Sequence, residues 1–236
     1  MLSPLLSVGI AHASPWEVGS TSPSSEYGIR SQFALKHSAS KNSWTHPELK
    51  FDAPLTPDLS YALSWGYGSQ TATAQPSQDG SIDATAKLKW RLAHHQQLRP
   101  DVLIEPKLGI NTGNRNDSIG SHAPSLKLPV RIGYPAGAFY WTAEVRYTRT
   151  FTHRTQDLIG YGVLAEYKLS PTLKVGIDLF NDQPTDNSSA QHWRSNAGFK
   201  QRISRHWQWR GLIGRSIDNQ RGELTTSTKL DIGYVF

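Results

Sequence analysis

Apolar and polar residues alternate along the C-terminal segment of the chain, and this period of two constrains the fold more than any other feature. One face of the segment carries Leu224, Thr226, Thr228, Leu230, Ile232, Tyr234 and Phe236. The opposite face includes Lys229 and Asp231. Successive side chains of a strand point to opposite faces, so the pattern predicts a strand between an apolar and a polar medium. A last strand that ends on an aromatic residue is typical of barrels in the bacterial outer membrane.

The same alternation recurs from Tyr27 onward in about twelve segments. Short turns such as 56–58 are followed by longer polar links such as 112–123, and outer-membrane barrels place such short and long connections at opposite rims. We therefore predict an all-β fold, a transmembrane, antiparallel, up-and-down β-barrel of about twelve strands over residues 26–236. Bulges are expected where proline falls within a predicted strand, at Pro47, Pro106 and Pro129.

Composition agrees with a barrel and excludes other classes. No apolar run approaches the roughly 20 residues of a membrane-spanning helix, which excludes a helical membrane protein. Apolar residues make up 37% of the chain, as expected where only alternate strand residues meet lipid. Cysteine is absent, so disulfides, iron–sulfur clusters and thiol catalysis are excluded.

The N-terminal residues differ from the rest of the chain. Residues 1–13 resemble a signal peptide, with a short apolar core and an Ala-His-Ala cleavage site at 11–13, although the positive first region is missing. We interpret them as a truncated signal peptide, and an ordinary flexible N-terminus is the alternative. Residues 14–25 are then expected to form a periplasmic segment ahead of the barrel.

Aromatic residues gather near both ends of the predicted strands, as two lipid headgroup layers would require. The residues expected at the membrane interfaces are Trp65, Tyr67, Trp90, Trp141, Trp193, Trp207, Trp209, Tyr234 and Phe236. This pattern predicts a location in the bacterial outer membrane, in contact with its lipid. The last strand is also expected to be recognised by the barrel-assembly machinery, and the barrel is expected to be a monomer.

Inward positions of the predicted strands hold most of the charge, and bases outnumber acids there by about two to one. The bases expected to line the lumen and set selectivity are Lys87, Lys89, Arg91, Arg131, Arg146, Arg194 and Arg202. A wet lumen with this excess would attract anions. Facing charges on neighbouring strands could instead pair and fill the barrel, so an open passage and a plugged lumen both remain possible at this point.

Catalytic and metal-binding patterns are missing. The outward polar strand positions are Ser31 and Ser195, and no histidine shares a strand face with either, as a serine hydrolase would need. No group of residues has metal-ligand spacing. We expect no enzyme activity, catalytic residue, metal or cofactor, and a lipid-modifying outer-membrane enzyme is the weakest alternative. Nucleic acid is not an expected partner, because the bases would lie inside a barrel.

The chain from about Gly80 to its end resembles the outer-membrane family named for the meta-pathway of phenol degradation. The matching pieces are residues 83–92, 106–113, 161–170 and 175–178, followed by the aromatic C-terminus. The family usually has proline where this chain has Asn111, and glutamate where it has Asp178. The resemblance implies passage of aromatic or other hydrophobic compounds across the outer membrane and assigns no functional residue.

Together these features predict an outer-membrane channel or transporter that passes a small-molecule solute through a basic-lined barrel. The solute could be aromatic, hydrophobic or anionic. One alternative is an anion-selective channel for acidic oligosaccharides. Another is a plugged structural barrel that interacts with partners through its loops.

Overall fold

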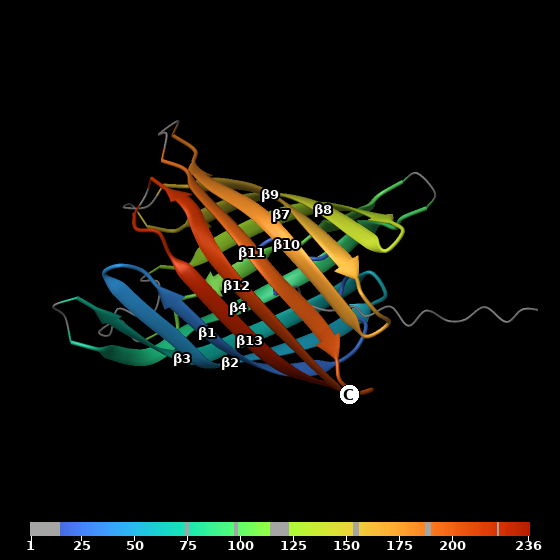
Figure 1. Ribbon diagram of the computed structural model, residues 1–236, viewed down its shortest axis with the longest axis horizontal. Helices are drawn as coiled ribbons and strands as arrows, with labels where there is room; N and C mark the ends of the chain where they lie inside the picture. Colours follow the sequence, from blue (N-terminus) through green and yellow to red (C-terminus); the bar gives the residue numbers. More distant parts are fainter. Residues whose placement is uncertain are drawn as a thin grey trace, which may run out of the picture.

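A single antiparallel sheet closes on itself in the computed structural model, which describes residues 15–73, 76–96, 99–113, 123–152, 156–186, 190–220 and 222–236 (Figure 1). The strands are β1 (Gly28–His37), β2 (Lys41–Thr56), β3 (Leu59–Ala72), β4 (Gln78–Ala93), β5 (Asp101–Ile104), β6 (Lys107–Ile110), β7 (Ser125–Ala136), β8 (Phe139–Thr150), β9 (Leu158–Lys168), β10 (Leu173–Pro184), β11 (His192–Arg202), β12 (Trp207–Asn219) and β13 (Thr226–Val235). No helix in these residues is long and apolar enough to cross a membrane.

Two of the thirteen strands share one position in the barrel. β5 and β6 both pair with β4 on one side and with β7 on the other. The barrel therefore has twelve strand positions. β13 closes it by pairing with both β12 and β1, so no sheet edge is left open. The predicted fold, an antiparallel barrel of about twelve strands, is confirmed.

The apolar residues of the alternating pattern face the outside of this barrel, and the polar residues face its inside. On β12 the outward Trp207, Trp209 and Ile213 are exposed, whereas the inward Gln208 and Arg210 are buried. β13 begins at Thr226, two residues later than its alternation, and keeps Asp231 inside while Ile232 is exposed. An apolar exterior around a polar interior is the reverse of a water-soluble barrel and suits a lipid environment.

Proline interrupts two of the three strands in which bulges were expected. The register shifts between Thr45 and Glu48, around Pro47, and the chain between β5 and β6 holds Glu105 and Pro106. Pro129 keeps regular pairing with β8. On its other side Pro129 faces the interruption between β5 and β6, where its carbonyl accepts a hydrogen bond from the Glu105 N–H at 3.0 Å. Because regular strand pairing is already interrupted there, the N–H that proline lacks is not needed.

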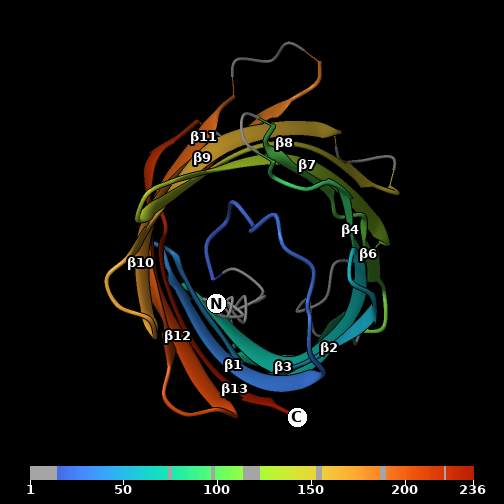
Figure 2. The same cartoon turned by 90° about the vertical axis from the view of Figure 1, so that its right-hand side faces the viewer.

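The N-terminal segment, defined here as residues 15–26, lies inside the barrel (Figure 2). Trp16, Val18 and Thr21 are all buried, at 4%, 0% and 1% exposure. This placement differs from the periplasmic one expected for residues 14–25. The physical reason is width: about eight strands can be filled by their own side chains, and twelve leave space that another segment can occupy. Residues 1–13, where a signal peptide is predicted, lie outside the described residues.

Candidate functional site in the barrel lumen

The N-terminal segment crosses the lumen from one wall to the other. Close to the start of β1, the Ser24 N–H donates to Ser60 Oγ on β3 at 2.9 Å. The Thr21 hydroxyl then hydrogen-bonds to that of Tyr140 on β8. Deeper in the barrel, the Gly19 N–H donates to the Glu144 carboxylate at 3.1 Å. The segment thus connects two regions of the wall that are not adjacent in the sheet.

Strand β10 holds the far end of the segment. The Asp178 carboxylate accepts the N–H groups of Glu17 at 2.6 Å and Val18 at 3.1 Å, and Trp16 Nε1 donates to the Gly176 carbonyl at 3.1 Å. Gly176 allows this approach, because a Cβ there would lie 2.8 Å from the indole ring. The apolar side chains of this contact form one buried cluster of Trp16, Val18, Leu164, Phe180 and Leu212.

Ion pairs surround the segment. Glu144 is only 2% exposed and accepts hydrogen bonds from Arg131 Nε at 2.6 Å and Arg146 Nε at 2.8 Å. Arg131 also reaches Glu105 at 2.9 Å, and Arg146 donates to the Glu17 carboxylate at 2.6 Å. Every charge in this network has an opposite neighbour, as buried ions require.

Glu17 is the acidic group that the segment adds to this network. Burial acts to raise its pKa, but the charges of Arg194 and Arg146 hold the pKa of the Glu17 carboxyl well below its ordinary value. Arg194 Nη2 lies 3.7 Å from Glu17 and also pairs with Asp182. Both guanidinium groups lie over the Phe180 ring, at 4.4 Å for Arg146 and 5.4 Å for Arg194. The segment is therefore held by charge as well as by apolar packing.

Other inward positions, on β1, β4, β6, β7 and β13, carry lysines without acidic ion-pair partners. We call these five lysines the lysine wall, and they are Lys36, Lys87, Lys107, Lys127 and Lys229. None of them forms an ion pair with another residue that the structure describes. Register explains part of this: Lys107 lies directly between Lys87 on β4 and Lys127 on β7. A smaller cavity of about 50 Å³ is lined by Lys87, Lys107 and Lys50 among others.

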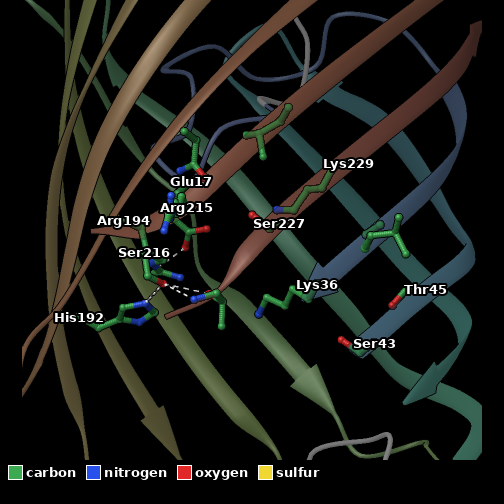
Figure 3. A pocket seen from close by; sticks show the side chains of 15 residues that line it. Glu17, Lys36, Ser43, Thr45, His192, Arg194, Arg215, Ser216, Ser227 and Lys229 are labelled. Carbon is green, nitrogen blue, oxygen red and sulfur yellow. Dashed lines mark hydrogen bonds and ion pairs between the residues drawn. The ribbon is translucent and has the colours of Figure 1, made fainter. Parts of the chain in front are cut away.

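A larger cavity of about 250 Å³ lies where the strands approach the long loops, and we call it the vestibule (Figure 3). Lys36, Arg194 and Lys229 reach its surface from three strands, and Glu17 lies at its inner end. On one side His192 Nε2 is 2.8 Å from Ser216 Oγ, which is also 2.9 Å from Thr225 Oγ1. The vestibule thus ends where the N-terminal segment begins to fill the barrel.

The bases predicted to line the lumen fall into separate groups. Lys89, Arg131 and Arg146 are buried and paired, with Lys89 Nζ 3.9 Å from Glu105. Arg91 is bonded at 3.0 Å to Asp58 in the turn between β2 and β3. The other three differ: Lys87 borders the smaller cavity, Arg194 borders the vestibule, and Arg202 is the last residue of β11. The structure does not bring the seven together as one ring, and their role in selectivity stays a prediction.

The predicted interface aromatics are distributed over two levels of the exterior. Trp65 and Tyr67 are exposed in the half of β3 toward the long loop, and Trp90, Trp141, Trp207, Trp209 and Phe236 are exposed near the short turns. Trp193 and Tyr234 are half-buried. Tyr234 packs against Trp207 and Phe236 at centroid distances of 5.2 and 5.3 Å. Their function as membrane-interface groups stays a prediction.

Sequence analysis did not predict that the N-terminal segment lies in the lumen, or that Ser216 contacts His192. The only signal for the first was an apolar Trp16 beside Glu17 in a segment without strand periodicity. Within the residues that the structure describes, no three histidine or acidic side chains gather as a metal site would require.

A closed barrel with an apolar exterior, aromatic residues near both ends and a charged lumen defines an outer-membrane β-barrel. The chain belongs to the family described as putative MetA-pathway of phenol degradation, whose model matches residues 25–228. This match covers the barrel from just before β1 into β13. No curated protein sequence matches the chain.

Solved structures with the same fold share little sequence with it. An outer membrane channel from Pseudomonas putida F1 is 15% identical with a TM-score of 0.70, covering 95% of this chain and 100% of that one. The translocator domain of the autotransporter NalP from Neisseria meningitidis is 11% identical with a TM-score of 0.63, covering 90% and 89%. The KdgM porin in complex with disordered oligogalacturonate is 10% identical with a TM-score of 0.59, covering 89% and 99%.

Proposed function

We propose that this protein is an outer-membrane channel for small molecules that its N-terminal segment holds closed. The observation that carries the proposal is that residues 15–26 occupy the lumen and are held there by noncovalent contacts. A segment held by hydrogen bonds and ion pairs can leave, whereas strand side chains that fill a barrel cannot. The channel and the porin among the similar structures support a transport role for this fold.

The solute class follows from the walls that the segment leaves uncovered. Five lysines without acidic partners give the lumen a positive field, which low-dielectric walls concentrate. We propose a preference for anions, including small aromatic acids in line with the family description. The porin bound to oligogalacturonate supports the alternative of an acidic oligosaccharide, which would use the same lysines.

A permanently plugged barrel is favoured by one observation, the network around Glu144. Its buried charges are so well paired that they could serve rigidity alone. In this alternative the protein would act through its loops and would pass no solute.

The proposal includes no enzyme activity. Ser216 and His192 are within hydrogen-bond distance, but Ser216 is 2% exposed and is also engaged by Thr225. A nucleophile needs a free approach for its substrate, and this hydroxyl lacks one. Recognition of β13 by the barrel-assembly machinery and a monomeric state are part of the proposal as well.

Planar bilayer recordings and solute flux into liposomes test the channel. We expect the full chain to show rare openings, and a variant lacking residues 15–22 to conduct steadily, because the deletion removes every contact with β8 and β10. Anions should permeate better than cations of equal size. A Glu26→Gln variant, altered at an exposed position of the same segment, should behave like the full chain. A correctly folded deletion variant with neither conductance nor flux would leave the plugged barrel as the better conclusion.

A further inference from the structure

Charge in the vestibule is unbalanced. Three basic side chains of its lining point inward, Lys36, Arg194 and Lys229, and the lining holds a single acid, Glu17. Glu17 belongs to the N-terminal segment, so the strand walls of the cavity contribute only the cations. When the segment leaves, nothing of opposite charge remains on the lining. A cavity of this kind favours an anionic occupant.

Arg194 has unused hydrogen-bonding capacity at the inner end of this cavity. Its Nη2 is engaged by Glu17 and Asp182, whereas its Nε is buried without an acceptor among the described residues. A buried donor without a partner is costly, and a ligand that supplies an acceptor removes that cost. The planar guanidinium fork matches a carboxylate, which can accept from two of its N–H groups at once.

The size and the other lining residues narrow the ligand class. The cavity of about 250 Å³ is smaller than the roughly 300–1,000 Å³ typical of sites for drug-sized ligands. Ala34 and Leu212 give it an apolar part beside the cations. These dimensions suit a small organic acid with a short apolar body or a single ring.

On the basis of the proposed channel, we propose that the vestibule binds small organic carboxylates that compete with Glu17 for Arg194. Glu17 already presents a carboxylate at this position, so the segment mimics the ligand that would displace it. Loss of this contact leaves the segment with its apolar cluster and the Asp178 bonds, and shifts it toward release. The solute would thus open its own passage.

Thermodynamic linkage gives the direction of the effect. A ligand shifts an equilibrium only by the difference in its affinity for the two states. In the closed state Arg194 is shared with Glu17, and in the open state Arg194 and Arg146 are both released from it. The carboxylate therefore binds the open state more tightly and favours opening.

The absence of native cysteine allows a direct test with a single introduced thiol. Ser20→Cys places a thiol of similar size at a position that is 9% exposed inside the barrel. Its rate of labelling by a water-soluble maleimide then reports release of the segment, independently of conductance. We expect benzoate to accelerate labelling several-fold, and benzyl alcohol, which has the ring without the charge, to have no effect.

Substitutions localise the effect. Lys36→Gln combined with Lys229→Gln should raise the benzoate concentration for half-maximal acceleration about tenfold, since each solvent-accessible cation contributes less than about 1 kcal/mol to binding a carboxylate. Lys41→Gln combined with Lys168→Gln removes two exposed charges outside the vestibule and should leave that concentration unchanged. Glu17→Gln should label quickly without ligand and respond little to benzoate.

Three outcomes would overturn the proposal: no response to benzoate, an equal response to benzyl alcohol, or slower labelling with benzoate. Failure of the channel proposal looks different, because the deletion variant would then pass no ions while benzoate still accelerated labelling. The two proposals are therefore tested separately.

Discussion

Two groups of inward-facing charged residues in the lumen differ in whether an opposite charge lies beside them. On β7 and β8, next to the N-terminal segment, Arg131 and Arg146 pair with Glu144 and are buried. The lysines of the lysine wall form no ion pair with another residue that the structure describes, and three of them, Lys87, Lys107 and Lys127, are direct neighbours. The first group is a closed electrostatic network, and we propose that the second attracts mobile anions.

Register accounts for the difference. Arg131 and Glu144 are directly opposite each other on β7 and β8, so an ion pair forms across the ladder. Lys107 instead has Lys87 and Lys127 as its direct neighbours. Pairing in a barrel therefore depends on which residues the shear places side by side, and the total number of charges does not decide it.

The largest expected effect comes from Glu144→Gln. Two buried guanidinium groups would lose their shared counter-ion, which typically costs about 3–5 kcal/mol in the free energy of unfolding. Lys107→Gln, in the lysine wall, removes a like-charge contact and should leave stability unchanged or slightly higher. Urea unfolding in lipid vesicles measures both. Equal losses for the two variants would show that the two groups do not differ in this way.

Much of this fold could be predicted from the sequence because a membrane barrel has a simple period. Alternation in segments such as residues 82–92 shows which side chains point inward, and the inward bases were found for that reason. The partners of those bases could not be predicted, since pairing of Arg131 with Glu144 depends on register. Lys89 and Arg131 were expected to face solute, and they lie instead in a buried network with Glu105.

The position of the N-terminal segment inside the lumen could not be predicted from the sequence for a different reason. Residues 15–26 have no periodicity, and their conformation is set by contacts with strands more than 100 positions away, such as Trp16 with Gly176. A tryptophan and an acid outside the barrel pattern did not reveal a binding site on β10. The vestibule was hidden as well, because its lining comes from five strands and the N-terminal segment, which only the fold brings together.

A smaller effect is expected where the segment is attached. Asp178→Asn keeps one acceptor but replaces charge-assisted bonds to the Glu17 and Val18 N–H groups, each worth about 1.5–3 kcal/mol. The ratio of open to closed time in bilayer recordings should rise about 10- to 100-fold. Glu48→Gln is the matched control, because this carboxylate contacts Lys50 and Gln32 on strands that do not hold the segment. An unchanged ratio for Asp178→Asn would show that the Asp178 contact does not hold the channel closed.

Acid should open the channel only at low pH. The pKa of Glu17 in the closed state lies below its ordinary value of about 4.3, so its contribution to closure is complete above that value. The contribution is lost as the pH falls through the lowered pKa. Open probability should therefore stay constant from pH 7 to about pH 4.5 and rise only below that value. Glu17→Gln should remove this rise, and an opening transition near pH 6 would contradict the assignment to Glu17.

The smallest effect tests the lysine wall alone. Lys87→Gln in the variant lacking residues 15–22 removes one of five lysines, and an exposed charge in water contributes less than about 1 kcal/mol. The anion-to-cation permeability ratio should fall by a factor of roughly two to five, which a shift in reversal potential under a salt gradient measures. Arg149→Gln is the control, because this arginine is exposed near the end of β8 and packs over the Phe151 ring outside the lysine wall. If both substitutions shifted the reversal potential equally, general surface charge would govern selectivity and the distinction between the two groups would not extend to permeation.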